Sequence, residues 1–321
     1  MKKYVVLIVL NIILFLWVGT GGTGRGEEMS TPYRFTFVCP LSWDSVAQGI
    51  GDADRDLGTN TKCVGAKNLN EDVQAMQLEK AILSDVDGII TAGTNVFGAA
   101  REKIEEAVKD GIPVVLVDSD IPDSGRICYI GTDHYAAGIQ AGEELIQAME
   151  GRDASIGVIV SSMEDTNQSE RVRGFQEAIG TAEGMEVVQV LECESDKMKI
   201  RKLVEEMLEE NQEINALYCA DEIASEMLGN TLGRAYLNIP IVTFGMSEQI
   251  YQYLQDGKYY ASIVEESYQQ GYQAVNYLKD YLNGRAEAVD VIYTDIQSAK
   301  EDFDFEAWRE SQGDTEVVWY F

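Results

Sequence analysis

The chain of 321 residues has little histidine, few basic residues and no closely paired cysteines, and each shortage excludes a class of protein. His134 is the single histidine, so no multi-histidine metal site can form, and only one imidazole is present to act as a general base. Lysine and arginine total 25 against 55 aspartates and glutamates, which gives a net charge of −30. Such a chain repels nucleic acids and anionic lipid headgroups, because binding them needs basic side chains.

Five cysteines occur without any CxxC pair, at Cys39, Cys63, Cys128, Cys193 and Cys219. Their odd number and wide spacing fit neither a zinc site nor a disulfide framework. Four of them lie in or beside apolar, β-rich runs. We therefore expect buried, reduced thiols that pack as small hydrophobic side chains.

The sequence also lacks the motifs of common enzymes, with no GxSxG, no Walker loop and no evident nucleophile–base pair. The adjacent acids Glu265 and Glu266 do not form a catalytic pair, since neighbouring residues on a strand point to opposite faces. The GxGxxG-like stretch at 19–26 follows an apolar segment rather than a β-strand, which indicates a flexible spacer. The sequence thus predicts a protein that is not an enzyme, with no cofactor and no metal.

The N-terminus has the layout of an export signal, with Lys2 and Lys3 ahead of an apolar run over residues 4–18. That run is short for a membrane-spanning helix, which needs about 20 residues. Neither a clear A-x-A cleavage site nor a lipid-modified cysteine follows. Residues 1–29 are therefore a cleaved signal peptide or an uncleaved membrane anchor, each with a glycine-rich spacer. Both alternatives place the chain from about residue 30 onward outside the cytoplasm.

From Tyr33 onward, short apolar strands alternate with amphipathic helices. Continuous apolar runs, such as residues 86–92 and 112–118, are typical of parallel strands covered by helices on both faces. The same pattern restarts at residues 155–161. The sequence predicts an α/β protein with two doubly wound parallel-sheet lobes, in which ligands bind at the carboxyl ends of the strands.

The order of several short motifs resembles one family. The motifs are PLSWDSVAQG, VDGIITAGTN, GIPVVLVDSD, YIGTDHYAAG, SERVRGF, ALYCADEIA, IVTFG and DGKYYASIVEESYQQG. Over roughly residues 33–297 the chain resembles type I periplasmic binding proteins of the ribose/galactose type, whose fold LacI-type repressors share in their effector domains. A repressor would need a helix-turn-helix where the export signal stands. The resemblance implies a monomer whose lobes close on a sugar.

The resemblance also implies a hinge of three crossovers between the lobes. The expected hinge positions are Asp133 with His134, Glu265, and Thr294. The expected lobes are residues 33–132 with 266–293, and residues 133–265 with 294–321. His134 is then a part of the hinge rather than a catalyst. Part of the aromatic tail after residue 300 is expected to pack on the second lobe.

Ligand-binding residues are carried over by position. The resemblance implies that Trp43 stacks on a sugar ring, that Asp118 accepts hydrogen bonds from hydroxyls, and that Arg171 binds ring and hydroxyl oxygens. Structural alternatives stay open: Trp43 as a helix staple, Asp118 as a turn cap, and Arg171 as an exposed side chain at a helix start. The remaining candidates are Thr94, Asn95, Asp165, Asn167, Asp221, Met246 and Glu265.

The chain departs from the family pattern at several of these positions. Ala220 stands where asparagine is common, Met246 where aspartate is common, Glu265 where glutamine is common, and Ser119 where arginine is often found. A site built to pair hydroxyls discriminates against ligands that lack them. These departures therefore imply a ligand different from, or less hydroxylated than, ribose or galactose.

Two functions remain open at the level of sequence. The first is a solute-binding protein that delivers a sugar-like ligand to an ABC-type importer. The second is the same module held by an uncleaved anchor, which reports its ligand to a membrane kinase or chemoreceptor. The first is the leading interpretation, while the missing cleavage site and the missing lipid-modified cysteine modestly favour the second.

Overall fold

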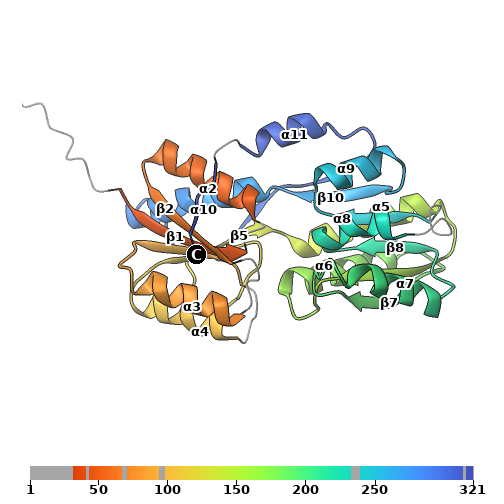
Figure 1. Cartoon of the computed structure of the whole chain (residues 1–321), viewed down its shortest axis with the longest axis horizontal. Coiled ribbons are helices and arrows are strands. Elements are labelled where there is room, and N and C mark those ends of the chain that lie inside the picture. The colour runs from red at the N-terminus through yellow and green to blue at the C-terminus, as the bar shows by residue number, and fades with distance from the viewer. Residues whose placement is uncertain are drawn as a thin grey trace, which may run out of the picture. The chain divides into compact units, whose positions relative to one another are not determined.

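The computed structural model describes residues 32–40, 43–66, 71–93, 98–232, 239–313 and 316–320, which fold around two β-sheets (Figure 1). The predicted signal or anchor at residues 1–29 lies outside the described residues. Within the described part, no helix combines the length and the apolar character that a membrane crossing requires.

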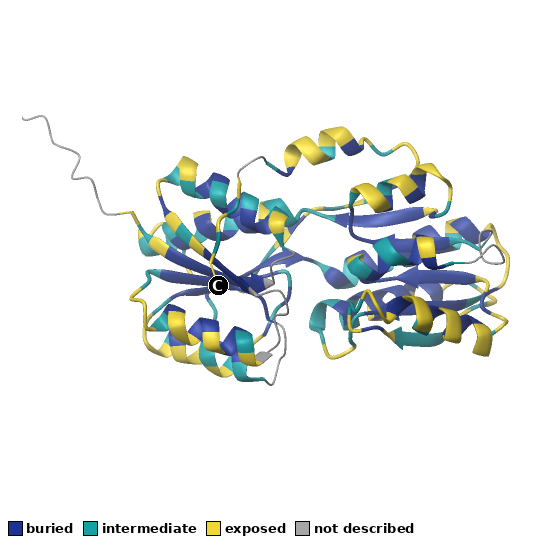
Figure 2. Ribbon diagram, viewed as in Figure 1, coloured by how far each residue is buried: buried dark blue, intermediate teal, exposed yellow. Residues whose placement is uncertain are grey.

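The first sheet has seven parallel strands in the order β11-β5-β4-β3-β1-β2-β13. Its strands are β1 (Arg34–Pro40), β2 (Asn60–Ala66), β3 (Gly88–Thr91), β4 (Val114–Val117), β5 (Cys128–Thr132), β11 (Val291–Thr294) and β13 (Trp319–Tyr320). One face packs against α2 (Asp44–Leu57) and α10 (Ser267–Leu282), and the other against α3 (Glu71–Ile82) and α4 (Ala99–Lys109). Because both faces are covered, the central strands are buried along their length (Figure 2).

The second sheet has six strands in the order β12-β10-β9-β8-β6-β7, parallel except for β12. Its strands are β6 (Ala154–Val160), β7 (Met185–Glu192), β8 (Ala216–Cys219), β9 (Ile241–Phe244), β10 (Ala261–Glu265) and β12 (Ile296–Ala299). One face packs against α5 (His134–Met149) and α6 (Thr166–Ile179). The other packs against α7 (Ile200–Glu210), α8 (Glu222–Thr231), α9 (Glu248–Gln255) and α11 (Phe305–Ser311). The predicted fold class, two doubly wound lobes, is confirmed.

The chain passes between the sheets at neighbouring strand ends. It leaves the first sheet after Thr132, returns after Glu265 and leaves again after Thr294. Thr132 is the partner of Thr294 in the β5–β11 pair, and Glu265 is the partner of Ile296 in the β10–β12 pair. Two of these connections therefore start from adjacent positions of the same sheet.

The C-terminal tail divides between the two lobes. Phe305 and Trp308 of α11 pack against the core of the second lobe, as expected for this part of the tail. The assignment of the chain end to that lobe is wrong, because Trp319 and Tyr320 form β13 and pair with β2 of the first sheet. The pairing covers an edge that β2 would otherwise expose, and Trp319 packs against the first core. The sequence predicted three passages, and β13 adds a fourth.

Ending the chain after Gly313 removes β13 and is expected to lower the free energy of unfolding by about 1–2 kcal/mol. The reason is the loss of a half-buried tryptophan and of backbone pairing at the sheet edge. Chemical denaturation of the shortened and full chains measures the difference. An unchanged midpoint would show that β13 adds nothing to the first lobe.

Two glycines bring α5 and α6 into backbone contact. A Cβ atom added to Gly138 would lie 2.0 Å from the carbonyl oxygen of Arg171, and one added to Gly174 would lie 2.0 Å from that of Tyr135. Any larger residue would push the helices apart. This close approach fixes the start of α5, where His134 lies, against the turn of α6 that carries Arg171.

All five cysteines are buried and free of disulfides, as the sequence predicted. Burial raises the pKa of the Cys63 and Cys128 thiols to about 12. These side chains therefore remain protonated and pack as hydrophobic groups.

Candidate ligand-binding site

Most of the predicted ligand-binding residues follow the carboxyl ends of strands in both sheets. Trp43 comes after β1, Asp118 after β4, Asp165 and Asn167 after β6, Asp221 after β8 and Met246 after β9, while Glu265 ends β10. Thr94 and Asn95 lie outside the described residues. The carboxyl end of a strand is where an open parallel sheet binds its ligands.

Asp118 connects the two lobes through its carboxylate. Its Oδ2 accepts hydrogen bonds from the Ser119 hydroxyl at 2.9 Å and from Nδ2 of Asn167 on α6 at 3.1 Å. Within the described part of the chain both bonds end on Oδ2, which leaves Oδ1 for a ligand hydroxyl. Burial of the carboxylate away from water, followed by the negative charge of Glu265, raises the pKa of Asp118 to about 7.

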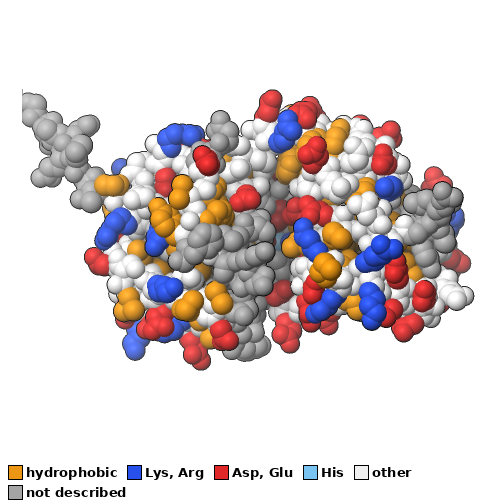
Figure 3. Space-filling model, viewed as in Figure 1, with side chains coloured by type: hydrophobic (Ala, Val, Ile, Leu, Met, Phe, Trp, Pro, Cys, Tyr) orange, Lys and Arg blue, Asp and Glu red, His pale blue; other side chains and the backbone are white. Residues whose placement is uncertain are grey.

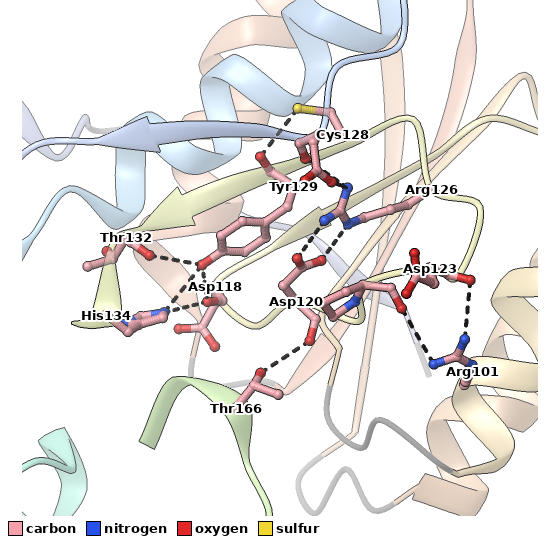
Figure 4. Close-up of polar contacts among 12 residues, drawn as sticks. Arg101, Asp118, Asp120, Asp123, Arg126, Cys128, Tyr129, Thr132, His134 and Thr166 are labelled. Atoms are coloured by element: carbon pink, nitrogen blue, oxygen red, sulfur yellow. Dashed lines mark hydrogen bonds and ion pairs between the residues drawn. The ribbon is translucent and has the colours of Figure 1, made fainter. Parts of the chain in front are cut away.

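The backbone of Asp118 is also held from the hinge side. Its φ of 62° is left-handed, which is uncommon for a residue other than glycine. Its carbonyl oxygen accepts hydrogen bonds from the Tyr129 hydroxyl at 2.6 Å and from Nε2 of His134 at 2.7 Å (Figure 4). Next to it, the Thr166 hydroxyl donates to the carbonyl of Asp120 at 3.1 Å. The corner after β4 is therefore tied to the second lobe at several points.

Arg171 is 3% exposed, which corrects the alternative of an exposed side chain at a helix start. Its Nε donates to Nδ1 of His134 at 3.2 Å and its Nη1 donates to the carbonyl of Ala220 at 2.8 Å. The guanidinium carbon lies 3.3 Å from the ring centroid of Phe244, a cation–π contact. The charged guanidinium of Arg171 is therefore held by uncharged groups: His134, the Ala220 carbonyl and the Phe244 ring.

His134 links Arg171 to Asp118. Because Nδ1 accepts a bond from Arg171, the proton of the neutral ring lies on Nε2, which donates it to the Asp118 carbonyl. Burial and the charge of Arg171 hold the pKa of His134 well below its usual range. The imidazole therefore stays neutral and bridges the start of α5 to both neighbours.

Glu265 is positioned by residues at the crossovers. Its Oε2 accepts from the Thr132 hydroxyl at 2.6 Å and from Nε2 of Gln270 at 3.4 Å. Its Oε1 accepts from the Ser267 hydroxyl at 3.4 Å. The end of β10 is thereby connected to β5 and to α10, while Thr294 is buried beside Thr132 in the β5–β11 pair.

Other candidates have structural tasks. Asp221 caps α8, since its Oδ1 accepts the Ala224 N–H at 2.7 Å and its Oδ2 accepts the Ser195 hydroxyl at 2.9 Å. Both of its oxygens therefore have protein donors. Asp133 caps α5 in the same way, through the Ala136 N–H.

Asp165 and Met246 are two further candidates. The Asp165 carboxylate accepts a hydrogen bond from the Ser161 hydroxyl, and burial raises its pKa. Met246 packs into the core of the second lobe with 6% of its surface exposed. The methionine therefore offers little surface to a ligand.

Trp43 is half-buried at the N-terminal end of α2. Its ring packs against the first core, with its centroid 6.5 Å from that of Phe37. This contact supports the staple alternative, and the remaining exposed part of the ring is the part that a ligand can reach.

A Trp43→Ala variant is expected to bind its ligand about tenfold more weakly, because a stacked ring contributes about 1 kcal/mol or more. Its melting temperature should also fall, since the ring touches the core. Calorimetric titration together with thermal melting separates the two roles. Unchanged affinity with a lower melting temperature would leave only the staple.

The sequence reasoning missed Glu222, the first residue of α8. A Cβ atom added to Gly245 would lie 2.5 Å from Cγ of Glu222, so this side chain lies across the end of β9. More than a third of the Glu222 surface is exposed. Desolvation of its carboxyl group by nearby protein atoms, followed by the negative charge of Glu265, nevertheless raises its pKa to about 8. The sequence feature that could have identified Glu222 is its position directly after Asp221. Because Asp221 caps α8, the side chain of Glu222 can face the strand ends.

The family model for the periplasmic binding protein domain matches residues 41–286. The chain therefore belongs to the periplasmic binding protein family. The resemblance predicted from the sequence motifs is thus confirmed, and the strand ends described above are those of a periplasmic binding protein fold.

Known members of this family resemble the chain over most of its length. A glucose-galactose binding protein, GanP from Geobacillus stearothermophilus, has a TM-score of 0.81 and 29% identity, covering 85% of this chain and 99% of GanP. The XylFII–LytSN complex contains a chain with a TM-score of 0.76 and 25% identity, covering 84% of this chain and 98% of that one. The D-apiose import binding protein of Actinobacillus succinogenes is 24% identical over 267 residues, 79% of this chain and 84% of its own.

Proposed function

We propose that this periplasmic binding protein is an extracytoplasmic, non-enzymatic solute-binding protein that takes up a sugar or sugar-like ligand and delivers it to an ABC-type importer. The observation that carries the proposal is the network joining Asp118 of the first lobe to Asn167, His134 and Arg171. It gathers acceptors and a cation from both lobes at the strand ends.

The chemistry of these groups suits a polyhydroxylated ligand. The Asp118 and Glu265 carboxylates accept hydrogen bonds from hydroxyls, and the Arg171 guanidinium donates to ring or hydroxyl oxygens. These residues come from different lobes, so one ligand is held fully only when the lobes close about the crossovers. The sugar-binding members of the family support this class of ligand.

A thermal-shift screen tests the proposal, using residues 30–321, which include the compact unit Tyr33–Phe321. The panel holds arabinose, xylose, glucose, galactose, apiose and polyols. A ligand at 100 times its Kd should stabilise the protein by about 2.7 kcal/mol, because it binds the folded state. An Asp118→Ala variant is the control and should lose the shift. No shift with any compound of the panel would contradict the proposed function.

A second function has one observation in its favour. The XylFII–LytSN complex shows that a chain of this fold is found bound to another protein. A module anchored by residues 4–18 would report its ligand to a membrane kinase or chemoreceptor. N-terminal sequencing of the protein from the cell envelope separates the two functions: an intact segment supports the sensor, and a cleaved one supports the soluble importer component.

A further inference from the structure

Among the described residues, the candidate site holds an excess of acidic groups around Arg171. Five carboxylates have charges that act on one another or on Arg171: Asp118, Asp165, Asp221, Glu222 and Glu265. They come from the corner after β4, the start of α6, the start of α8 and the end of β10. Acids of both lobes are therefore concentrated at the strand ends.

These five carboxylates have no ion-pair partner among the described residues. Several acids elsewhere do have one, such as Asp120 with Arg126, Glu205 with Arg201 and Glu144 with Lys300. Figure 3 shows acidic and basic side chains interspersed on the face it presents. The hydrogen bonds of Arg171 go to His134 and Ala220 instead of to an acid. The negative charge of the site is therefore only partly compensated.

A buried amide next to Glu265 adds a further acceptor. Gln270 is 1% exposed, and its Nε2 lies 3.4 Å from both Oε2 of Glu265 and Oγ1 of Thr132. Its Oε1 is buried, and no donor among the described residues forms a hydrogen bond with it. A buried carbonyl oxygen without a donor is costly, and a donor-rich ligand group would satisfy it.

We infer that the ligand of this site carries a protonated amino group, as an amino sugar does, and that the ammonium is received by Glu265, Asp118 and Glu222. An ammonium offers three donors and no acceptor, which matches a site whose described residues are rich in acceptors and include few cations. This inference rests on the proposed function and names the chemical class of the ligand.

Matched pairs of ligands test the inference on the full chain. Calorimetric titration compares D-glucosamine with D-glucose and D-galactosamine with D-galactose, with the neutral N-acetyl sugars as a third arm. At least one amino sugar is expected to bind about tenfold or more tightly than its neutral partners, with an affinity that falls as salt is added. Tighter binding of the neutral sugar in both pairs would overturn the inference and leave sugar binding intact. No binding in any arm would contradict the proposed function and the inference together.

A charge-neutral variant sharpens the test. Glu265→Gln keeps the shape and the hydrogen-bonding reach of the side chain and should weaken amino-sugar binding about tenfold or more, while neutral sugars are affected less. Glu209→Gln, an exposed position on α7, makes the same change in total charge and should leave both affinities unchanged. Equal losses for amino and neutral sugars in Glu265→Gln would overturn the role of its charge.

Discussion

An Arg171→Ala variant is expected to lose both stability and ligand binding. The substitution leaves Nδ1 of His134 and the carbonyl of Ala220 without their donor in a buried region, and it removes the contact with Phe244. Each buried group left unpaired costs about 1–3 kcal/mol, so the free energy of unfolding should fall by about 2–5 kcal/mol. Affinity should fall about 10- to 100-fold, because hydrogen bonds to a charged group contribute about 1.5–3 kcal/mol.

Arg173 provides a matched control two residues further along α6. Its side chain is 60% exposed and pairs with Glu170 at the surface, so Arg173→Ala should leave the stability close to that of the parent. Arg171→Lys keeps the charge without the planar fork and should recover part of the binding. Denaturant titration and calorimetry measure the two effects. Arg171→Ala protein with the stability of the parent would contradict the buried role of Arg171, and parent-like affinity would contradict its place in the site.

An Asp118→Asn variant is expected to gain stability above neutral pH while its ligand binding weakens about tenfold or more. Asparagine tolerates the left-handed φ of 62° and keeps an acceptor for Ser119 and Asn167. It cannot ionise, so it removes the unfavourable charge near Glu265. The same change removes the charged acceptor for ligand hydroxyls or an ammonium.

The pH dependence follows from the raised pKa of Asp118. Between its ordinary pKa of 3.8 and its folded pKa of about 7, the folded state holds a proton that the unfolded chain has released. The stability contributed by this proton is therefore full below about pH 4 and is lost as the pH rises to 7. Glu265 and Asp165 oppose the ionised form, and Arg171 favours it.

Thermal melting from pH 5 to pH 8 measures this effect. Asp118→Asn should show a smaller fall in melting temperature over this range than the parent. Asp123→Asn is the control, because Asp123 has a φ of 61° but is exposed. Parallel slopes for the parent and Asp118→Asn would contradict the raised pKa, and equal ligand affinity would contradict the role of Asp118 as an acceptor.

The fold was predictable because its information is local and repeated. Apolar runs alternate with amphipathic helices, and this pattern is sufficient to indicate two doubly wound sheets. The pairing of β13 with β2 was not predictable, because a two-residue strand has no periodicity and its partner lies more than 250 positions away. Edge pairing of this kind depends on where the folded tail can reach.

The position of the candidate residues at the strand ends was predictable, but their contacts were less so. A residue at or after the end of a buried strand lies at the carboxyl edge of the sheet, and this rule sufficed to place Asp118 and Glu265 there. The burial of Arg171 depends on His134, Ala220 and Phe244, which come from three other elements. Asp221 caps α8 and Glu222 faces the strand ends. To predict which acid does which, one must know the exact residue at which α8 begins.

The central claim is that one ligand is bound by both lobes at the strand ends. A crystal structure of the protein with the tightest ligand from the screen tests it most directly. Ligand atoms are expected within hydrogen-bonding distance of the Asp118 carboxylate in the first lobe and of the Arg171 guanidinium in the second. A ligand that contacts one lobe only, or that lies away from both residues, would contradict it.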